Sequence, residues 1–168
     1  MNRFVTEWES GKPETPCGKG SRFDTTGIIR GWLPEVIRTY GIRTIADMGC
    51  GDQNWIHHCL PDDVEYQGYD VMPRRQDVLP FDITREVLRD PVDLILCIYV
   101  LNHLYTPELI QRSVRLMKES GSKYLLATYR EGDMEDEGLI ERMHHKTKTY
   151  ANNDSVDWHY GLWSLNEK

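Results

Sequence analysis

The sequence predicts a single α/β domain: a Rossmann-like open sheet, mostly parallel, with helices on both faces. A length of 168 residues fits one domain. After a first helix-spaced segment, short apolar blocks typical of buried strands alternate with helical segments, an order that favours a parallel sheet. A glycine-rich turn follows the first of these strands. Since such sheets bind ligands where strands end and their order reverses, we expect the functional residues at the carboxyl ends of the strands.

The first helix is expected over residues 25–41, where apolar side chains recur at helical spacing. Thr25 or Thr26 can cap its start, and Gly41 can end it. Pro34 lies inside this segment and is the residue at which the helix could break.

The alternation of elements begins after this helix. Buried strands are expected at residues 44–47, 91–98 and 123–129, an alternating strand at 64–70 and a short strand at 77–81. The block at 91–98 is apolar on both faces, as in a central parallel strand. Helices are expected over residues 53–60, where Pro61 stops the segment, and from Thr106, a capping residue with proline after it, to 117.

The C-terminal part predicts an abbreviated sheet edge. Residues 138–143 fit a short helix, and one clear late strand is expected at 156–164, because 146–152 is the only other segment that could supply a second strand. An edge strand here would expose three aromatic side chains, those of Trp158, Tyr160 and Trp163. Such a surface is covered most simply by a second copy, so a homodimer is expected.

Composition limits the function classes. The net charge is −7, from 20 basic and 27 acidic residues, so nucleic acid is a less favoured partner than a small molecule. No apolar stretch reaches the length of a membrane span, and the first residues lack a secretory signal. The cysteines have no metal-binding spacing, so no metal site is predicted and a cytoplasmic location is expected; they are Cys17, Cys50, Cys59 and Cys97.

The turn after the first strand predicts a nucleoside site. Gly49 and Gly51 allow a tight turn and a close approach of ligand to backbone. Asp70 ends the next strand, where a carboxylate can accept hydrogen bonds from ribose hydroxyls. The dinucleotide fingerprint requires a glycine where Asn54 stands, so NAD is not expected. Acidic residues flank the turn, and they would repel a pyrophosphate but attract an ammonium group.

These residues resemble the first motif of class I S-adenosylmethionine-dependent methyltransferases. The motif covers Asp47, Gly49, Cys50, Gly51 and Asp52, although Gln53 replaces the usual third glycine. The resemblance continues with Asp82, which would bind the adenine amino group, and with the fourth-strand segment that ends at Cys97. It implies S-adenosylmethionine as the cofactor.

The N-terminal residues resemble the arm of small bacterial and phage methyltransferase-domain proteins, through residues 8–11 and 18–21. We therefore divide the chain into an arm over the cofactor site, residues 1–24, and one methyltransferase domain, residues 25–168. Gly20 and Ser21 of the arm are expected to contact the methionine end of the cofactor.

Two functions fit the acceptor side. The first is methyl transfer to an acceptor, with a small molecule favoured and with His103, which follows the fourth strand, taking the acceptor's proton. A structural histidine bonded to its own loop is the other interpretation of His103. The second function is a non-catalytic methyltransferase-like binding module that acts through a partner. The acidic run at residues 131–137 is either a solvated loop or a feature that favours an amine acceptor.

Overall fold

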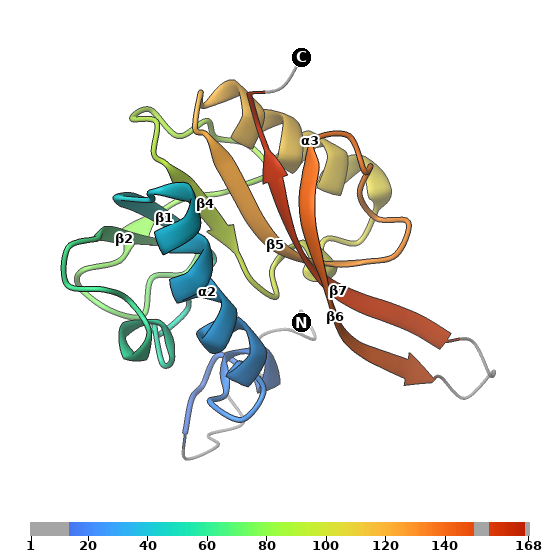
Figure 1. Cartoon of the computed structure of the whole chain (residues 1–168), viewed down its shortest axis with the longest axis horizontal. Coiled ribbons are helices and arrows are strands. Elements are labelled where there is room, and N and C mark those ends of the chain that lie inside the picture. The colour runs from blue at the N-terminus through green and yellow to red at the C-terminus, as the bar shows by residue number, and fades with distance from the viewer. Residues whose placement is uncertain (1–13, 150–154, 167–168) are drawn as a thin grey trace.

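A computed structural model describes residues 14–149 and 155–166 (Figure 1). The strands are β1 Thr44–Met48, β2 Glu65–Asp70, β3 Leu79–Pro80, β4 Leu94–Cys97, β5 Tyr124–Arg130, β6 Leu139–Thr149 and β7 Ser155–Ser164. The α-helices are α2 Gly27–Tyr40 and α3 Pro107–Glu119. Three single 3-10 turns are η1 Lys19–Ser21, η2 Ile56–His58 and η3 Leu101–His103. The first residues of the proposed arm, including 8–11, lie outside the described residues.

The described strands form one seven-stranded sheet in the order β3-β2-β1-β4-β5-β7-β6. β1 to β5 run parallel, and β7 lies antiparallel between β5 and β6. The chain moves outward from β1 to β3 and then returns to place β4 on the other side of β1. The order therefore reverses between β1 and β4, which is where open α/β sheets form their ligand crevice. The predicted fold class is confirmed.

Helices cover both faces of this sheet because the strand side chains alternate. Ile45, Leu94 and Leu126 point into a core cluster with α2, whereas their neighbours Ala46, Ile95 and Leu125 point into a second cluster with α3. Figure 1 shows the two helices on different sides of the strands. The expected break at Pro34 does not occur, because α2 continues through it. Within the described residues no helix is both long and apolar enough to cross a bilayer.

The short helix expected over 53–60 is wrong in its extent. Only the single 3-10 turn η2 forms, and Gln53 has a left-handed backbone (φ 60°) that an α-helix cannot contain. The glycine turn therefore leads into an irregular segment, and its backbone N–H groups are not those of an α-helix.

The C-terminal edge is corrected by the structure: two long strands stand where an abbreviated edge with one clear strand was expected. The late strand at 156–164 is β7, but residues 138–143, expected as a helix, belong to β6. β6 bulges between Leu139 and Glu141 and again between His144 and Lys146. A bulge changes the face to which side chains point, so the period-two pattern of a strand is hidden in the sequence.

This strand order removes the reason for expecting a homodimer, which was an exposed edge strand at 156–164. β7 is an inner strand, and its aromatic side chains are buried within the chain itself; they are Trp158, Tyr160 and Trp163. The apolar surface that a second copy was expected to cover is therefore already covered by β6 and by the two core clusters.

Candidate functional site

The turn after β1 and the turn after β4 meet at the switch point of the sheet. Gly49 has a φ of 86°, and a Cβ atom on it would lie 2.3 Å from Cγ2 of Val100. No other residue type fits this position without moving the backbone, because both the left-handed conformation and the contact exclude a side chain. The predicted glycine turn thus forms one side of the crevice that the strand order creates.

Asp70 holds this turn against the end of β2. One carboxylate oxygen accepts a hydrogen bond from the backbone N–H of Gly51 (2.9 Å), and the other accepts one from Met72 (2.8 Å). The N–H groups of Gly49 and Cys50 donate to the carbonyl of Tyr69. Asp70 is only 8% exposed, yet a carboxylate has about four acceptor positions, so two remain for a ligand.

Asp47 lies deeper under the same turn. Its carboxylate is 4% exposed and accepts a hydrogen bond from the hydroxyl of Tyr66 (2.7 Å). Burial raises the pKa of Asp47 to about 7, and the nearby charge of Asp70 acts in the same direction, while the bond from Tyr66 opposes both. The site therefore holds a carboxyl group that can carry a proton near neutral pH.

The described part of the arm packs directly on the glycine turn. A Cβ atom on Gly51 would lie 2.9 Å from Sγ of Cys17, and one on Gly20 would lie 2.9 Å from the side chain of Tyr99. η1 is thus placed between the turn after β1 and the turn after β4. The arm segment that carries Gly20 and Ser21 therefore lies beside the glycine turn, and its contact with a cofactor stays a prediction.

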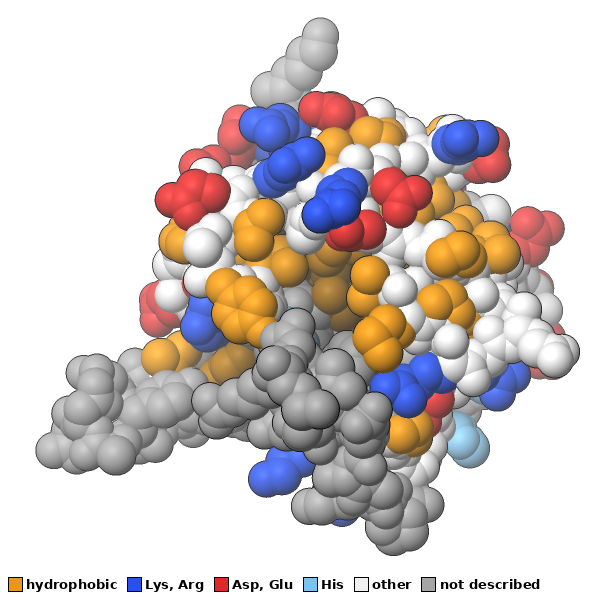
Figure 2. Space-filling view, turned by 180° about the vertical axis from the view of Figure 1, so that it is seen from behind, with side chains coloured by type: hydrophobic (Ala, Val, Ile, Leu, Met, Phe, Trp, Pro, Cys, Tyr) orange, Lys and Arg blue, Asp and Glu red, His pale blue; other side chains and the backbone are white. Residues whose placement is uncertain are grey.

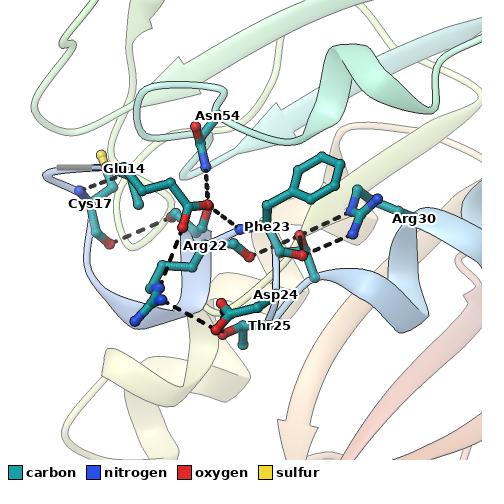
Figure 3. A network of polar contacts seen from close by, with 11 residues as sticks. Glu14, Cys17, Arg22, Phe23, Asp24, Thr25, Arg30 and Asn54 are labelled. Carbon is teal, nitrogen blue, oxygen red and sulfur yellow. Dashed lines mark hydrogen bonds and ion pairs between the residues drawn. The ribbon is translucent and has the colours of Figure 1, made fainter. Parts of the chain in front are cut away.

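Polar contacts fasten the arm in this position (Figure 3). The amide of Asn54 donates to the carbonyl of Ser21 (3.0 Å) and to the carboxylate of Glu14 (3.0 Å). The same carboxylate accepts a bond from the backbone N–H of Phe23, which is the main reason why the pKa of Glu14 lies below its ordinary value. Arg22 adds an exposed ion pair with Glu14.

The remaining predicted residues divide into two groups. Asp52 and Asp82 lie at turns beside the crevice, where each caps backbone N–H groups of its own loop; Asp82 follows β3, which pairs with the end of β2. Cys97 is fully buried in the core cluster under α3, so its thiol is not brought to the crevice. His103 lies in η3 and is exposed.

Several contributors were not assigned a site role from the sequence. Tyr66 supports Asp47, and Asn54 and Glu14 hold the arm. Gln53 keeps the left-handed backbone that a third glycine would adopt and bonds to His57 (2.9 Å). Only the role of Tyr66 had a signal in the sequence. Side chains alternate along β2, so Tyr66 lies on the same face of the sheet as Gly68. Contacts from Asn54 to the arm cross about forty residues and have no local pattern.

The back of the molecule is hollowed near its centre (Figure 2). Hydrophobic side chains surround this hollow, and the charged ones lie mostly farther out.

Among the residues that the structure describes, no three histidine, cysteine or acidic side chains are grouped as metal ligands.

The fold is that of known methyltransferases. The N-methyltransferase NodS from Bradyrhizobium japonicum WM9, solved with S-adenosyl-L-homocysteine, is similar over 99% of this chain and 100% of its own, with a TM-score of 0.68 and 12% identity. CalS10 from Micromonospora echinaspora, an amino pentose methyltransferase solved with S-adenosylmethionine, matches 86% of this chain and 78% of its own (TM-score 0.55, 15% identity). The methyltransferase domain of bacterial CtHen1 matches 83% and 99% (TM-score 0.59, 13% identity).

At these identities the likeness establishes the fold alone. No family model matches the sequence, and neither does any curated protein.

Proposed function

We propose that the chain transfers a methyl group from S-adenosylmethionine to a small-molecule acceptor. The observation that carries this proposal is the glycine turn at the switch point, held to Asp70 through the N–H of Gly51. That arrangement presents a carboxylate and a side-chain-free backbone to the same crevice, which suits a ribose joined to a group that approaches the chain closely.

The residues present fit this cofactor. Asp70 retains acceptor positions for ribose hydroxyls, and the acidic side chains of Asp47 and Asp52 suit the ammonium group of the methionine part. Val71 and Met72 follow Asp70 and are exposed apolar side chains, 63% and 44%. An adenine ring lying on them would remove apolar surface from water. When bound, the cofactor supplies an electrophilic methyl group on a sulfonium.

The chain's own contribution is positioning. Methyl transfer is an in-line displacement, so the rate depends on how the acceptor is held and on the exclusion of water. The arm covers the glycine turn through Cys17, and Asn54 fastens it there. We therefore assign the arm the role of closing the methionine end of the site.

The acceptor class follows from charge and from the structural relatives. A net charge of −7 disfavours a phosphate backbone. NodS is an N-methyltransferase and CalS10 acts on an amino pentose, which supports a small molecule with an amine. His103 stays a prediction as proton acceptor.

Calorimetry with S-adenosylmethionine, S-adenosylhomocysteine and NAD tests the cofactor. We expect the first two to bind and NAD not to bind. Asp70→Ala should weaken S-adenosylhomocysteine binding about 10- to 100-fold, because a charged acceptor in a buried contact contributes about 1.5–3 kcal/mol. Asp62→Ala is the control, since Asp62 is an exposed turn residue. Binding of NAD alone would refute the proposal.

Incubation with a labelled methyl donor tests the reaction. Transfer to an added small molecule supports an enzyme. Cofactor binding without transfer to any acceptor would instead identify the chain as a non-catalytic binding module that acts through a partner.

A further inference from the structure

Three side chains from separate parts of the chain meet beside the arm. Tyr99 lies in the turn after β4, His145 on β6 and Tyr160 on β7. The hydroxyl of Tyr99 is hydrogen-bonded to Nε2 of His145 and lies 3.1 Å from the hydroxyl of Tyr160. The ring of His145 lies over that of Tyr160, with 4.7 Å between their centroids. We call these three residues the tyrosine–histidine cluster.

The cluster borders the proposed cofactor site. A Cβ atom on Gly20 would lie 2.9 Å from Tyr99, while Cys17 of the same arm makes the equivalent contact with Gly51. Tyr99 also precedes Val100, the residue against which Gly49 packs. The cluster therefore lies across the arm from the glycine turn, beside the proposed cofactor site.

The backbone of Tyr99 is held in an unfavourable conformation. Its φ is 59°, in the left-handed region that costs a residue with a side chain about 1–2 kcal/mol. Such strain persists where the surrounding contacts maintain it, and these sites often take part in function. Here the strain directs the phenol toward His145 and Tyr160 rather than along the path of the strand.

A buried hydroxyl without a hydrogen-bond partner lies on the same face. Thr128 on β5 is directly opposite Tyr160 on β7, so both side chains point to the same side of the sheet. Oγ1 of Thr128 is fully buried and has no partner among the described residues. An unsatisfied buried hydroxyl costs about 1–3 kcal/mol, so this face of the sheet beside the cluster is not packed as a purely apolar core.

The phenols of the cluster are neutral. Burial raises the pKa of Tyr99 to about 12 and raises the pKa of Tyr160 further, so both phenols stay uncharged at neutral pH. A neutral phenol bonded to an imidazole can accept a proton from an ammonium group while it passes its own proton to the imidazole.

Resting on the proposed methyltransferase function, we propose that the tyrosine–histidine cluster is the acceptor wall of the site, and that the acceptor is an amine whose proton the cluster removes. Tyr99 is the group that touches the amine. His145 and Tyr160 act through Tyr99, so they are positioning residues, and His145 holds the proton.

The proton and electron balance is simple. With Nε2 of His145 unprotonated, the hydroxyl of Tyr99 donates to it; Tyr99 takes a proton from the acceptor's ammonium group as its own proton passes to Nε2. The nitrogen lone pair then forms a bond to the methyl carbon, the carbon–sulfur bond breaks, and its electrons remain on sulfur. The imidazolium returns its proton to water.

The test uses the full chain, a labelled methyl donor, and glucosamine and glucose as a matched amine and hydroxyl pair. Tyr99→Phe retains the ring and should lower kcat about 100-fold, the range of proton-transfer catalysis, while the Kd for S-adenosylhomocysteine stays within about twofold. His145→Gln should lower kcat at least about 10-fold and remove the acid limb of the pH profile. Tyr99 and Tyr160 are titratable groups that contact this imidazole.

His144→Gln is the matched control. His144 is the adjacent residue on the same strand, but it points to the opposite face, where it contacts His159. We expect its kcat and pH profile to equal those of the wild type. His103→Gln, measured beside it, distinguishes the cluster from the histidine that the sequence suggested.

The outcomes separate the two proposals. Full activity of Tyr99→Phe and His145→Gln toward the amine would overturn the cluster's role. Methylation of glucose but not of glucosamine would overturn the amine and leave the methyltransferase function standing. Cofactor binding with no transfer to either compound class, across a wider panel of both, would overturn both.

Discussion

The two halves of the sheet differ in how their buried polar groups are satisfied. Around β1 and β2, Asp47 is bonded to Tyr66 and Asp70 to two backbone N–H groups. Around β5 and β7, the hydroxyl of Thr128 and both ring nitrogens of His159 are buried without a hydrogen-bond partner among the described residues. The first half is complete before a ligand arrives, whereas the second is not.

This difference indicates where each ligand contributes. A cofactor that meets a complete site finds rigid acceptors and loses little energy to reorganisation. A ligand that reached such a group would gain the energy of a bond that the free protein lacks. Buried unsatisfied groups in a native protein need an explanation, and the proposed acceptor site would give one for the β5–β7 half.

The largest expected effect tests how rigid the half of the sheet around β1 and β2 is. Gly49→Ala places a Cβ atom into Val100 and forces alanine into a left-handed conformation. Together these should lower the free energy of unfolding by about 2–4 kcal/mol and abolish cofactor binding. Urea unfolding measures the first and calorimetry the second.

Gly31→Ala is the control for this substitution. Gly31 lies in α2, and no atom lies within 4 Å of a Cβ atom placed on it. Alanine there should raise the free energy of unfolding by up to about 1 kcal/mol. A stable Gly49→Ala variant that binds S-adenosylhomocysteine normally would show that the turn is not rigid.

A pair of hydroxyl deletions compares the halves directly. Tyr66→Phe leaves Asp47 buried without its donor and should cost about 1.5–3 kcal/mol of unfolding free energy. Thr128→Val removes a hydroxyl that has no partner among the described residues, so it should leave stability unchanged or raise it by up to about 1 kcal/mol. Equal losses in the two variants, measured by urea unfolding, would contradict the comparison.

The pH dependence of stability tests the buried carboxyl. In the folded chain the pKa of Asp47 is raised from 3.8 to about 7, so the folded state holds this proton more tightly than the unfolded state. The contribution of Asp47 to unfolding free energy therefore falls as pH rises from about 4 to about 7 and is constant above that. The slope within the window is up to about 1.4 kcal/mol per pH unit.

Asp47→Asn should remove this slope, while the amide oxygen that replaces the carboxylate still accepts the bond from Tyr66. The measurement is the difference in unfolding free energy between variant and wild type at several pH values. A difference that does not change between pH 4 and 7 would mean that Asp47 has its ordinary pKa.

The smallest expected effect concerns the arm. Asn54→Ala removes two hydrogen bonds to arm residues and should weaken S-adenosylhomocysteine binding about 3- to 10-fold, because each bond contributes about 1 kcal/mol or less. Hydrogen exchange along residues 14–24 should slow when the cofactor binds the wild type, and less so in the variant. Gln76→Ala, an exposed change, is the control. If the exchange rates of these residues do not change when the cofactor binds, the arm has a structural role only.

The sequence was most informative where local rules decide the outcome. Thr106 accepts a bond from the N–H of Leu109 and caps α3 as its type and position indicate. The glycine turn was predictable because left-handed backbone and close approach both require glycine. The position of Asp70 beside the turn was predictable because a neighbouring parallel strand must end there.

The rest depended on contacts between distant residues. The bulges of β6 hide its alternation, so Leu139 and Met143 fitted a helix instead. The contact between Tyr99 and His145 joins residues 46 positions apart, and no local sequence pattern predicts such a contact. Trp158 was expected on an exposed edge because the sequence could not show that a second strand would cover it.

The inner position of β7 has a consequence for the growing chain on the ribosome. β5 is made well before β7, so its outer row of N–H and C=O groups stays unpaired until residues 155–164 emerge. An apolar strand with an open edge can pair with other nascent chains. Folding is therefore most exposed to aggregation in the interval between synthesis of β5 and β7, and slow translation through β6 would lengthen it.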